Sequence, residues 1–252
     1  MPAFEVVFFD SGGTLYDEDP VRAHAVGDPS VPEHYAAAPR RAWHALLGLG
    51  VEVPFERLSA ALVAGEDEGR TRAGDGFTDL TRLAIALRHC GIAPRPELVA
   101  YVADAFAGPR YLSWVAPGTR EMLASLHDAR VDLGVIANTH WTSFSMDRAF
   151  AGVGLLGFLR TRVYSGDVGV AKPDARIFRI AAERASVGAR RVLFVGNDAT
   201  TDGQGARNAG WPVALRDGPG VATFGPDCVY RTWDELLAYV GLPPLDRARR
   251  SG

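Results

Sequence analysis

Strand and helix patterns alternate along the second half of the chain, and this alternation limits the fold more than any other feature. Apolar, strand-like runs lie at 131–137, 161–164, 191–195 and 212–215. Helical patterns separate them, at 119–129, 145–150, 175–184 and 203–209. Such alternation is typical of a parallel sheet with helices on both faces. A run rich in Val and Phe at 4–9 adds a strand buried on both faces, so we expect an α/β fold with a doubly wound, Rossmann-like parallel sheet.

The stretch from residue 17 to residue 109 has no strand pattern. Its helical periodicities are separated by Gly and Pro breakers and cover 36–49, 55–68, 80–90 and 97–106. We therefore predict an all-helical cap domain at 17–109. This cap would be inserted into an α/β core made of residues 1–16 and 110–252.

Composition excludes several classes of protein. A chain of 252 residues with 47% hydrophobic content can bury a sizeable core. The formal net charge of -3 provides no basic field, so we expect no nucleic-acid partner. No apolar stretch has membrane-spanning length, no signal pattern appears, and the two cysteines cannot build a disulfide framework. We expect a cytoplasmic protein with no membrane partner, as a monomer or a homodimer.

Polar residues follow four of the predicted strands. In an open parallel sheet, ligands bind outside the carboxyl ends of the strands. The residues at that edge are Asp10, Asn138, Thr139, His140, Lys172, Asn197, Asp198 and Asp202. Crowded carboxylates repel one another, and a divalent cation relieves the repulsion. Oxygen ligands beside a phosphate substrate favour Mg²⁺.

Four segments at this edge resemble, in order, the four motifs of the haloacid dehalogenase (HAD) superfamily. They read "FFDSGGTL", "LGVIANT", "GVAKPDARIF" and "VLFVGNDATTDGQGARNAG". Each motif alone is weak, but the four occur in the family's order, each after a predicted strand. The similarity spans essentially the whole chain, and the helical stretch resembles a cap inserted after the first motif.

The resemblance implies a role for each matching residue. Asp10 would be the nucleophile that attacks phosphorus and forms an aspartyl-phosphate, with Thr14 holding its loop. Lys172 would neutralise the phosphoryl oxygens and the nucleophile. Asn138 and Thr139 are expected to bind the phosphoryl group.

The resemblance also implies a set of metal ligands, namely Asp10, the backbone carbonyl of Gly12 and residues of the fourth motif. The family often has an acid directly after the glycine of that motif, where this chain has Asn197. We therefore favour Asp198 over Asn197 as the main ligand there. Asp202 is expected either to accept a hydrogen bond from a group next to the metal ligands or to orient Lys172. The alternative is that it only caps the helix that follows.

Two positions depart from the pattern of the family's phosphatases. Ala137 stands where the second motif normally offers a hydroxyl, and Thr139 is the available substitute. Gly12 stands where the phosphatases have an aspartate that acts as general acid and base, and losing such a group lowers the rate by about 10²- to 10⁴-fold. The candidate replacements for this acid are Asp17, Glu18, Asp19 and His140.

The pattern predicts a HAD-like hydrolase, a Mg²⁺-dependent phosphatase that acts on a small phosphorylated metabolite such as a sugar phosphate. One alternative is hydrolysis of a carbon–halogen or carbon–phosphorus bond, although the dehalogenases' tyrosine and serine-rich fourth motif are absent, as is an obvious Schiff-base lysine in the cap. Another alternative is a non-catalytic phospho-ligand binding protein, which Gly12 and Ala137 favour. Candidate substrate contacts in the cap are His34, Tyr35, Arg40, Arg41, Trp43, His44, Arg70 and Arg72.

Overall fold

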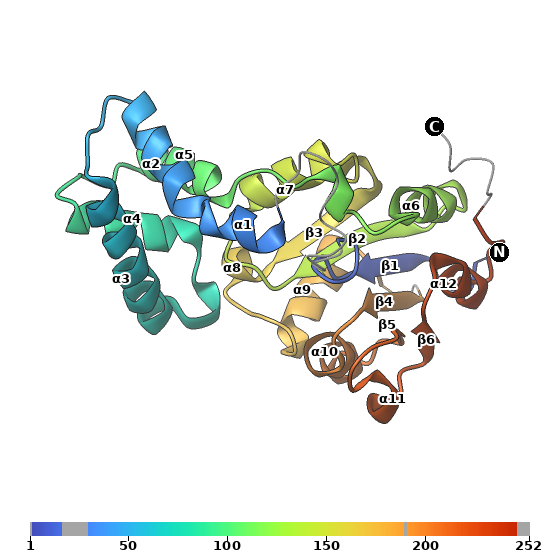
Figure 1. Cartoon of the computed structure of the whole chain (residues 1–252). Helices are drawn as coiled ribbons and strands as arrows, with labels where there is room; N and C mark the ends of the chain where they lie inside the picture. Colours follow the sequence, from blue (N-terminus) through green and yellow to red (C-terminus); the bar gives the residue numbers. More distant parts are fainter. Residues whose placement is uncertain (1, 17–29, 189–190, 246–252) are drawn as a thin grey trace.

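A six-stranded parallel sheet forms the centre of the molecule in the computed structural model, which describes residues 2–16, 30–188 and 191–245 (Figure 1). Its strands are β1 (Val6–Phe9), β2 (Asp132–Ala137), β3 (Leu159–Tyr164), β4 (Val192–Gly196), β5 (Val213–Arg216) and β6 (Cys228–Tyr230). Their order is β3-β2-β1-β4-β5-β6. The chain winds outward from β1 to one edge and then returns to build the other half from β4. This reversal of direction beside β1 marks the ligand-binding crevice of doubly wound sheets.

Helices cover both faces of the sheet. Against one face pack α6 (Thr119–Asp128), α7 (Ser143–Gly152) and α12 (Trp233–Val240). Against the other pack α9 (Ala175–Arg184), α10 (Gln204–Asn208) and α11 (Val221–Phe224). The short helix α8 (Ser165–Val168) follows β3, and single turns lie at Leu112–Trp114, Leu156–Phe158 and Ala199–Gly203. The predicted doubly wound sheet is confirmed.

Strand β1 is covered by helices on both faces, which explains its uninterrupted apolar sequence. Val7 and Phe9 point into the hydrophobic core under α6, α7 and α12. Val6 and Phe8 point into the opposite core, under α9 and α10. Successive side chains of a strand alternate between faces, so a strand covered on both sides needs apolar residues at every position.

The first half of the chain forms a helical cap, which lies to one side of the sheet (left in Figure 1). Its helices are α1 (Val31–Ala36), α2 (Ala38–Gly48), α3 (Phe55–Ala73), α4 (Asp79–His89) and α5 (Pro96–Ala107), with a single turn at Gly74–Gly76. They enclose a hydrophobic core of their own, which includes Leu46, Leu58, Leu83 and Val102. The helical cap is confirmed, whereas its predicted limits stay predictions, and residue 17 lies outside the described residues.

The elements differ from the predicted ones in two places. The helix predicted at 36–49 is α2, which begins at Ala38 because Pro39 is tolerated in the first turn of a helix, where its missing N–H has no partner to lose. A separate short helix, α1, precedes it and was not predicted. The prediction also missed β6, since three residues are too few for a strand pattern to emerge, and the helix α12 that follows it. Within the described residues, no helix combines the length and the apolar character needed to cross a membrane.

Candidate active site

Asp10 follows β1 directly, at the carboxyl end of the central strand. Its backbone N–H donates to the carbonyl oxygen of Val195 at 2.8 Å, which ties the start of the loop to β4. The chain then turns at Gly13, whose φ is 75°. A Cβ at Gly13 would lie 2.5 Å from Nδ2 of Asn197, so the turn requires glycine both for its conformation and for this close approach.

Lys172 joins two carboxylates that come from opposite ends of the chain. Its Nζ lies 2.6 Å from Oδ1 of Asp10 and 2.7 Å from Oδ1 of Asp202. The Lys172 side chain is only 2% exposed, as is that of Asp202, while that of Asp10 is 12% exposed. Lys172 is also the only lysine of the chain, which otherwise uses arginine. We call these three residues the core triad.

Burial and charge act against each other in the core triad. The pKa of Asp10 is raised to about 6, because burial and the neighbouring Asp202 carboxylate raise it by more than the ammonium of Lys172 lowers it. Burial alone would lower the pKa of Lys172, but the two carboxylates outweigh it, so that this pKa is raised. The lysine therefore stays protonated at neutral pH and provides a buried positive charge beside Asp10.

Asn138 holds the backbone of Lys172 from the loop after β2. Its Nδ2 donates to the Lys172 carbonyl at 2.9 Å, and its Oδ1 accepts from the Lys172 N–H at 2.8 Å. The amide thus uses both of its ends to place the lysine. Contact between this amide and a phosphoryl group stays a prediction, and it would require these bonds to break.

Thr139 stabilises the same loop. Its hydroxyl accepts from the N–H of Trp141 at 3.0 Å, and its own N–H donates to Oγ of Ser165 at 2.9 Å. The preceding Ala137 is fully buried. A phosphate contact through the Thr139 hydroxyl also stays a prediction. In the structure that oxygen accepts a hydrogen bond within its own loop.

Asp202 connects Lys172 to the fourth motif. Its Oδ2 accepts from the backbone N–H groups of Asn197 and Asp198, at 3.0 and 3.1 Å. A Cβ at Gly196 would lie 2.6 Å from Cγ of Asp202, so the carboxyl packs directly on the end of β4. Both oxygens of Asp202 are therefore committed to fixed donors, and this side chain holds Lys172 in place.

The two candidate metal residues of the fourth motif face different surroundings. Asp198 is exposed, and its Oδ1 accepts from the backbone and hydroxyl groups of both Thr200 and Thr201. The Thr200 hydroxyl holds the pKa of Asp198 below its usual value. Asn197 instead lies against the Asp10 loop, with Oδ1 3.2 Å from Oγ1 of Thr14. This placement favours Asn197, contrary to the preference drawn from the sequence, although metal binding by either residue stays a prediction.

The oxygen atoms around the Thr14 hydroxyl are ligands of the type that a hard cation needs. Its hydroxyl lies 3.3 Å from Oδ2 of Asp10 and 3.2 Å from Oδ1 of Asn197, and a single hydroxyl hydrogen can serve only one of these two acceptors. Oxygen ligands of this kind suit Mg²⁺. Among the described residues, however, no group of three or more His, Cys, Asp or Glu side chains could hold a metal ion. The set fits Mg²⁺ in its chemistry, with Asp10 as its only formal charge.

A second charged contact joins the core to the cap. Nδ1 of His140, in the loop after β2, lies 3.1 Å from Oδ1 of Asp79, the first residue of α4. The N–H of Asp79 also donates to the His140 carbonyl at 2.7 Å. We call this His140–Asp79 contact the seam pair. Sequence reasoning singled out His140 but missed Asp79, since a helix-starting aspartate carries no signal of the loop on which it docks.

Most of the predicted substrate contacts in the cap have structural partners. His34 and Arg41 bind the carbonyl groups at the end of α5, including that of Ala107. Trp43 donates to the Val53 carbonyl at 2.8 Å. Arg70 and Arg72 pair with Glu66 and Glu68 one turn earlier on α3. These interactions explain the positions of His34, Arg41, Trp43, Arg70 and Arg72 without any contact to a substrate.

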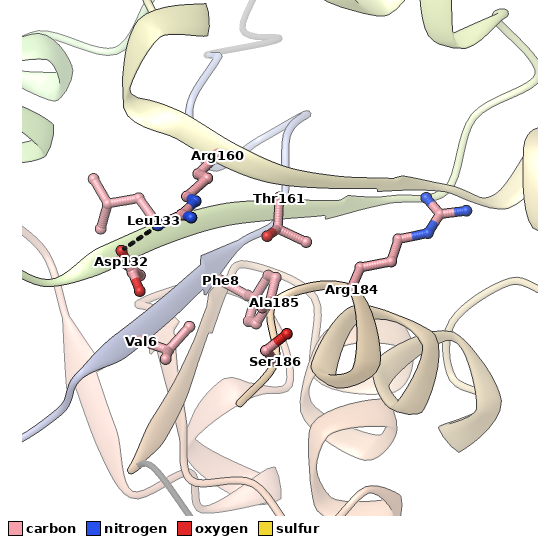
Figure 2. A pocket seen from close by; sticks show the side chains of 9 residues that line it. All are labelled: Val6, Phe8, Asp132, Leu133, Arg160, Thr161, Arg184, Ala185 and Ser186. Atoms are coloured by element: carbon pink, nitrogen blue, oxygen red, sulfur yellow. Dashed lines mark ion pairs between the residues drawn. The ribbon is translucent and has the colours of Figure 1, made fainter. Parts of the chain in front are cut away.

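The cavity shown in Figure 2 is separate from this site. It has a volume of about 230 Å³ and is lined by residues at the beginning of β1 and β2 and at the end of α9, such as Val6, Asp132 and Arg184. The Asp132–Arg160 ion pair crosses its wall at 3.8 Å. Asp10 follows the opposite end of β1, so this cavity does not contain the core triad.

Comparisons with curated proteins find relatives of similar length. The phosphoglycolate phosphatase of Yersinia pseudotuberculosis is 26% identical over 255 residues, covering 96% of this chain and 96% of the relative. That of Salmonella typhimurium is 27% identical over 252 residues, covering 95% and 94%. The glyceraldehyde 3-phosphate phosphatase of Methanopyrus kandleri is 29% identical over 136 residues, which cover 53% of this chain and 58% of the relative.

Solved structures share the fold. The 2-haloacid dehalogenase of Pseudomonas syringae superposes with a TM-score of 0.62 at 22% identity, covering 94% of this chain and 98% of that chain. A HAD phosphatase of Thermococcus onnurineus gives a TM-score of 0.55 at 19% identity, covering 96% and 100%. The family model of the haloacid dehalogenase-like hydrolases matches residues 4–210. With this match across most of its length, the chain belongs to the haloacid dehalogenase-like hydrolase family.

Proposed function

We propose that this hydrolase is a Mg²⁺-dependent phosphatase that acts on a small phosphomonoester through Asp10. The observation that carries the proposal is the core triad, in which a buried ammonium lies 2.6 Å from a carboxylate at the carboxyl end of β1. A transferring phosphoryl group needs a nucleophile and a fixed positive charge close together. The names of the full-length relatives, which are phosphatases of a small phosphorylated acid, support the same reaction class.

The chemistry of the proposal follows from the positions of these groups. Oδ2 of Asp10 attacks phosphorus, the bond between phosphorus and the ester oxygen breaks, and the leaving alcohol takes up a proton. Water then attacks the phosphorus of the aspartyl-phosphate, releasing phosphate and restoring Asp10. Lys172 stays bound to Oδ1 of Asp10 and offsets the negative charge of the phosphoryl oxygens, while Asp202 keeps its ammonium in place.

Mg²⁺ would be held by the carboxylate of Asp10, the amide oxygen of Asn197 and the carbonyl of Gly12. When bound, it would offset the charge of the phosphoryl group. Because this set carries one carboxylate, we expect it to bind Mg²⁺ more weakly than a site with two or three carboxylates. Asp198 would join only if its carboxylate turned away from Thr200 and Thr201.

The residues disfavour the alternative bond types. Cleavage of a carbon–phosphorus bond through an imine would need a lysine in the cap, and the only lysine of the chain is Lys172, buried in the core. Gly12 stands where the dehalogenases carry a tyrosine. The fold shared with dehalogenase structures at 22% identity does not extend to their reaction.

Phosphate release tests the proposal directly. We would assay the purified chain on sugar phosphates, phosphoglycolate and acyl phosphates, with Mg²⁺ or with EDTA. Asp10→Asn should abolish release, whereas Asp67→Asn, which changes an exposed aspartate of α3, should leave it intact. Release that is absent in the wild type, or unaffected by Asp10→Asn, would overturn the proposal.

A further inference from the structure

The proposed phosphatase lacks a proton source at the position where relatives carry one. Gly12 has no side chain, so nothing there can protonate the leaving alcohol. In an in-line displacement, the ester oxygen leaves on the side of phosphorus opposite to the Asp10 oxygen that attacks. A replacement acid must therefore reach the side of the phosphorus that faces away from the attacking oxygen of Asp10, where a residue of a neighbouring loop or of the cap can lie.

His140 occupies the core side of that seam. Strands β1 and β2 are neighbours, with Phe9 level with Val135, so the loops that carry Asp10 and His140 leave adjacent strands at the same edge. His140 is the third residue beyond the end of β2, and three residues of chain span at most about 11 Å. The imidazole ring faces the cap, with its centroid 6.1 Å from that of Phe77.

Asp79 fixes the orientation of this imidazole. The aspartate is 1% exposed, and it binds His140 twice, through its carboxylate at 3.1 Å and its backbone N–H at 2.7 Å. A carboxylate at Nδ1 selects the ring form that carries hydrogen there and leaves Nε2 as the nitrogen that exchanges protons. No described residue hydrogen-bonds to that Nε2, and the His140 side chain is 36% exposed. The second nitrogen is thus accessible from the seam.

An arginine lies between the carboxylate of the seam pair and a second carboxylate. Arg82 of α4 lies 3.6 Å from Oδ1 of Asp79 and 2.6 Å from Oε2 of Glu66 on α3. Arg82 thus links Asp79 of the seam pair to Glu66, and these three side chains together carry a net charge of -1.

We propose that His140, oriented by Asp79 of the cap, is the general acid that replaces the aspartate missing at Gly12. This assignment rests on the proposed phosphatase function. As the phosphorus–ester bond breaks, its electron pair stays on the leaving oxygen, which takes the proton from Nε2 of His140. The neutral imidazole then accepts a proton from the water that attacks the aspartyl-phosphate. Because Asp79 belongs to the cap, the acid is complete only when the cap is seated on the core.

A series of leaving groups tests the role of His140. An alkyl phosphate needs a proton on its leaving oxygen, whereas the nitrophenolate group of nitrophenyl phosphate leaves readily without protonation. His140→Gln should lower kcat/KM for alkyl phosphates by about 10²- to 10⁴-fold and for nitrophenyl phosphate much less. His89→Gln is the matched control, because His89 also pairs with a carboxylate, that of Glu68 at 3.2 Å, on an exposed part of the cap. An equal loss on both substrates, or no loss, would overturn the assignment.

Two further variants separate this role from a structural one. Gly12→Asp, added to His140→Gln, should restore activity on alkyl phosphates because it supplies the acid at the family's usual position. Asp79→Asn should lower kcat/KM for alkyl phosphates more than for nitrophenyl phosphate, since the carboxylate that orients His140 is gone. No rescue by Gly12→Asp, or an equal loss on both substrates in Asp79→Asn, would count against the assignment. A wild type that releases no phosphate would instead refute the proposed function itself.

Discussion

The core triad and the seam pair are both contacts between acids and bases at the edge of the sheet, yet they are built differently. The triad draws its residues from loops that leave β1 and β4 and from the loop before α9, all within the core. The seam pair joins a core loop to the first residue of α4. The Lys172 side chain is 2% exposed, whereas that of His140 is 36% exposed.

This difference shows which contacts of the site form within the core alone and which need the cap. The triad is held by backbone hydrogen bonds and packing that exist wherever the core is folded, including the clamp of Asn138 on Lys172. The seam pair exists only where the cap meets the core. We therefore expect changes in the triad to affect folding and activity together, and changes at contacts between cap and core to spare the fold.

The largest effect is expected from Lys172→Met. It leaves the carboxylates of Asp10 and Asp202 buried without a counter-charge, which should lower the free energy of unfolding by about 3–5 kcal/mol and abolish phosphate release. Urea denaturation and the phosphate assay measure the two effects. Arg176→Met is the control, because this exposed cation forms its ion pair with the neighbouring Asp174 and the substitution should change stability by less than about 1 kcal/mol.

Adding Asp202→Asn to Lys172→Met sharpens this test. The double variant removes one of the two unpaired carboxylates, so part of the lost stability should return while activity stays absent. A single variant as stable as the wild type would show that the triad is not the buried ionic network described above.

A smaller effect is expected from Gly196→Ala, which keeps every functional group. The new Cβ would lie 2.6 Å from Cγ of Asp202 and push this carboxylate away from Lys172. Overpacking of this kind lowers the free energy of unfolding by about 1–3 kcal/mol, and kcat should fall with it. The control is Gly152→Ala at the end of α7, where a Cβ has no neighbour within 4 Å. Full activity in Gly196→Ala would mean that Asp202 does not need to hold Lys172.

The smallest effect is expected from Asp104→Asn, at another contact between cap and core. Asp104 of α5 accepts from Nε of Arg148 at 2.8 Å and from Oγ of Ser145 at 2.9 Å, both on α7. Both charged side chains are partly exposed, at 34% for Arg148 and 24% for Asp104. The substitution should lower the free energy of unfolding by about 1 kcal/mol or less.

Salt distinguishes this contact from the triad. Raising the ionic strength from about 0.1 M to about 1 M shortens the screening length from about 10 Å to about 3 Å, so the effect of Asp104→Asn should shrink. Denaturation curves of the wild type and the variant at both salt concentrations measure this change. The effect of Lys172→Met should stay the same, and equal salt dependence of the two variants would erase the distinction between buried and exposed contacts.

Much of the site follows from residue order in a parallel sheet. Asp10, Lys172 and Asp202 were predicted to share one edge, and the structure brings the three side chains into contact. Asp198 shows where such reasoning ends, because its carboxylate is engaged by the threonines that follow it while Asn197 faces Thr14. Spacing along the sequence does not tell which of two adjacent side chains turns toward the nucleophile.

The sequence by itself determined the doubly wound sheet, the helical cap and the edge at which the polar residues gather, because hydrophobic periodicity and strand order are local properties of the chain. Only the tertiary structure decided which polar atoms remain available there. Asn138 and Thr139 are engaged within the core, whereas one nitrogen of His140 has no described partner. Hydrogen-bond partners depend on loops far apart in the sequence, and the pairing of His140 with Asp79 depends on how the cap packs against the core.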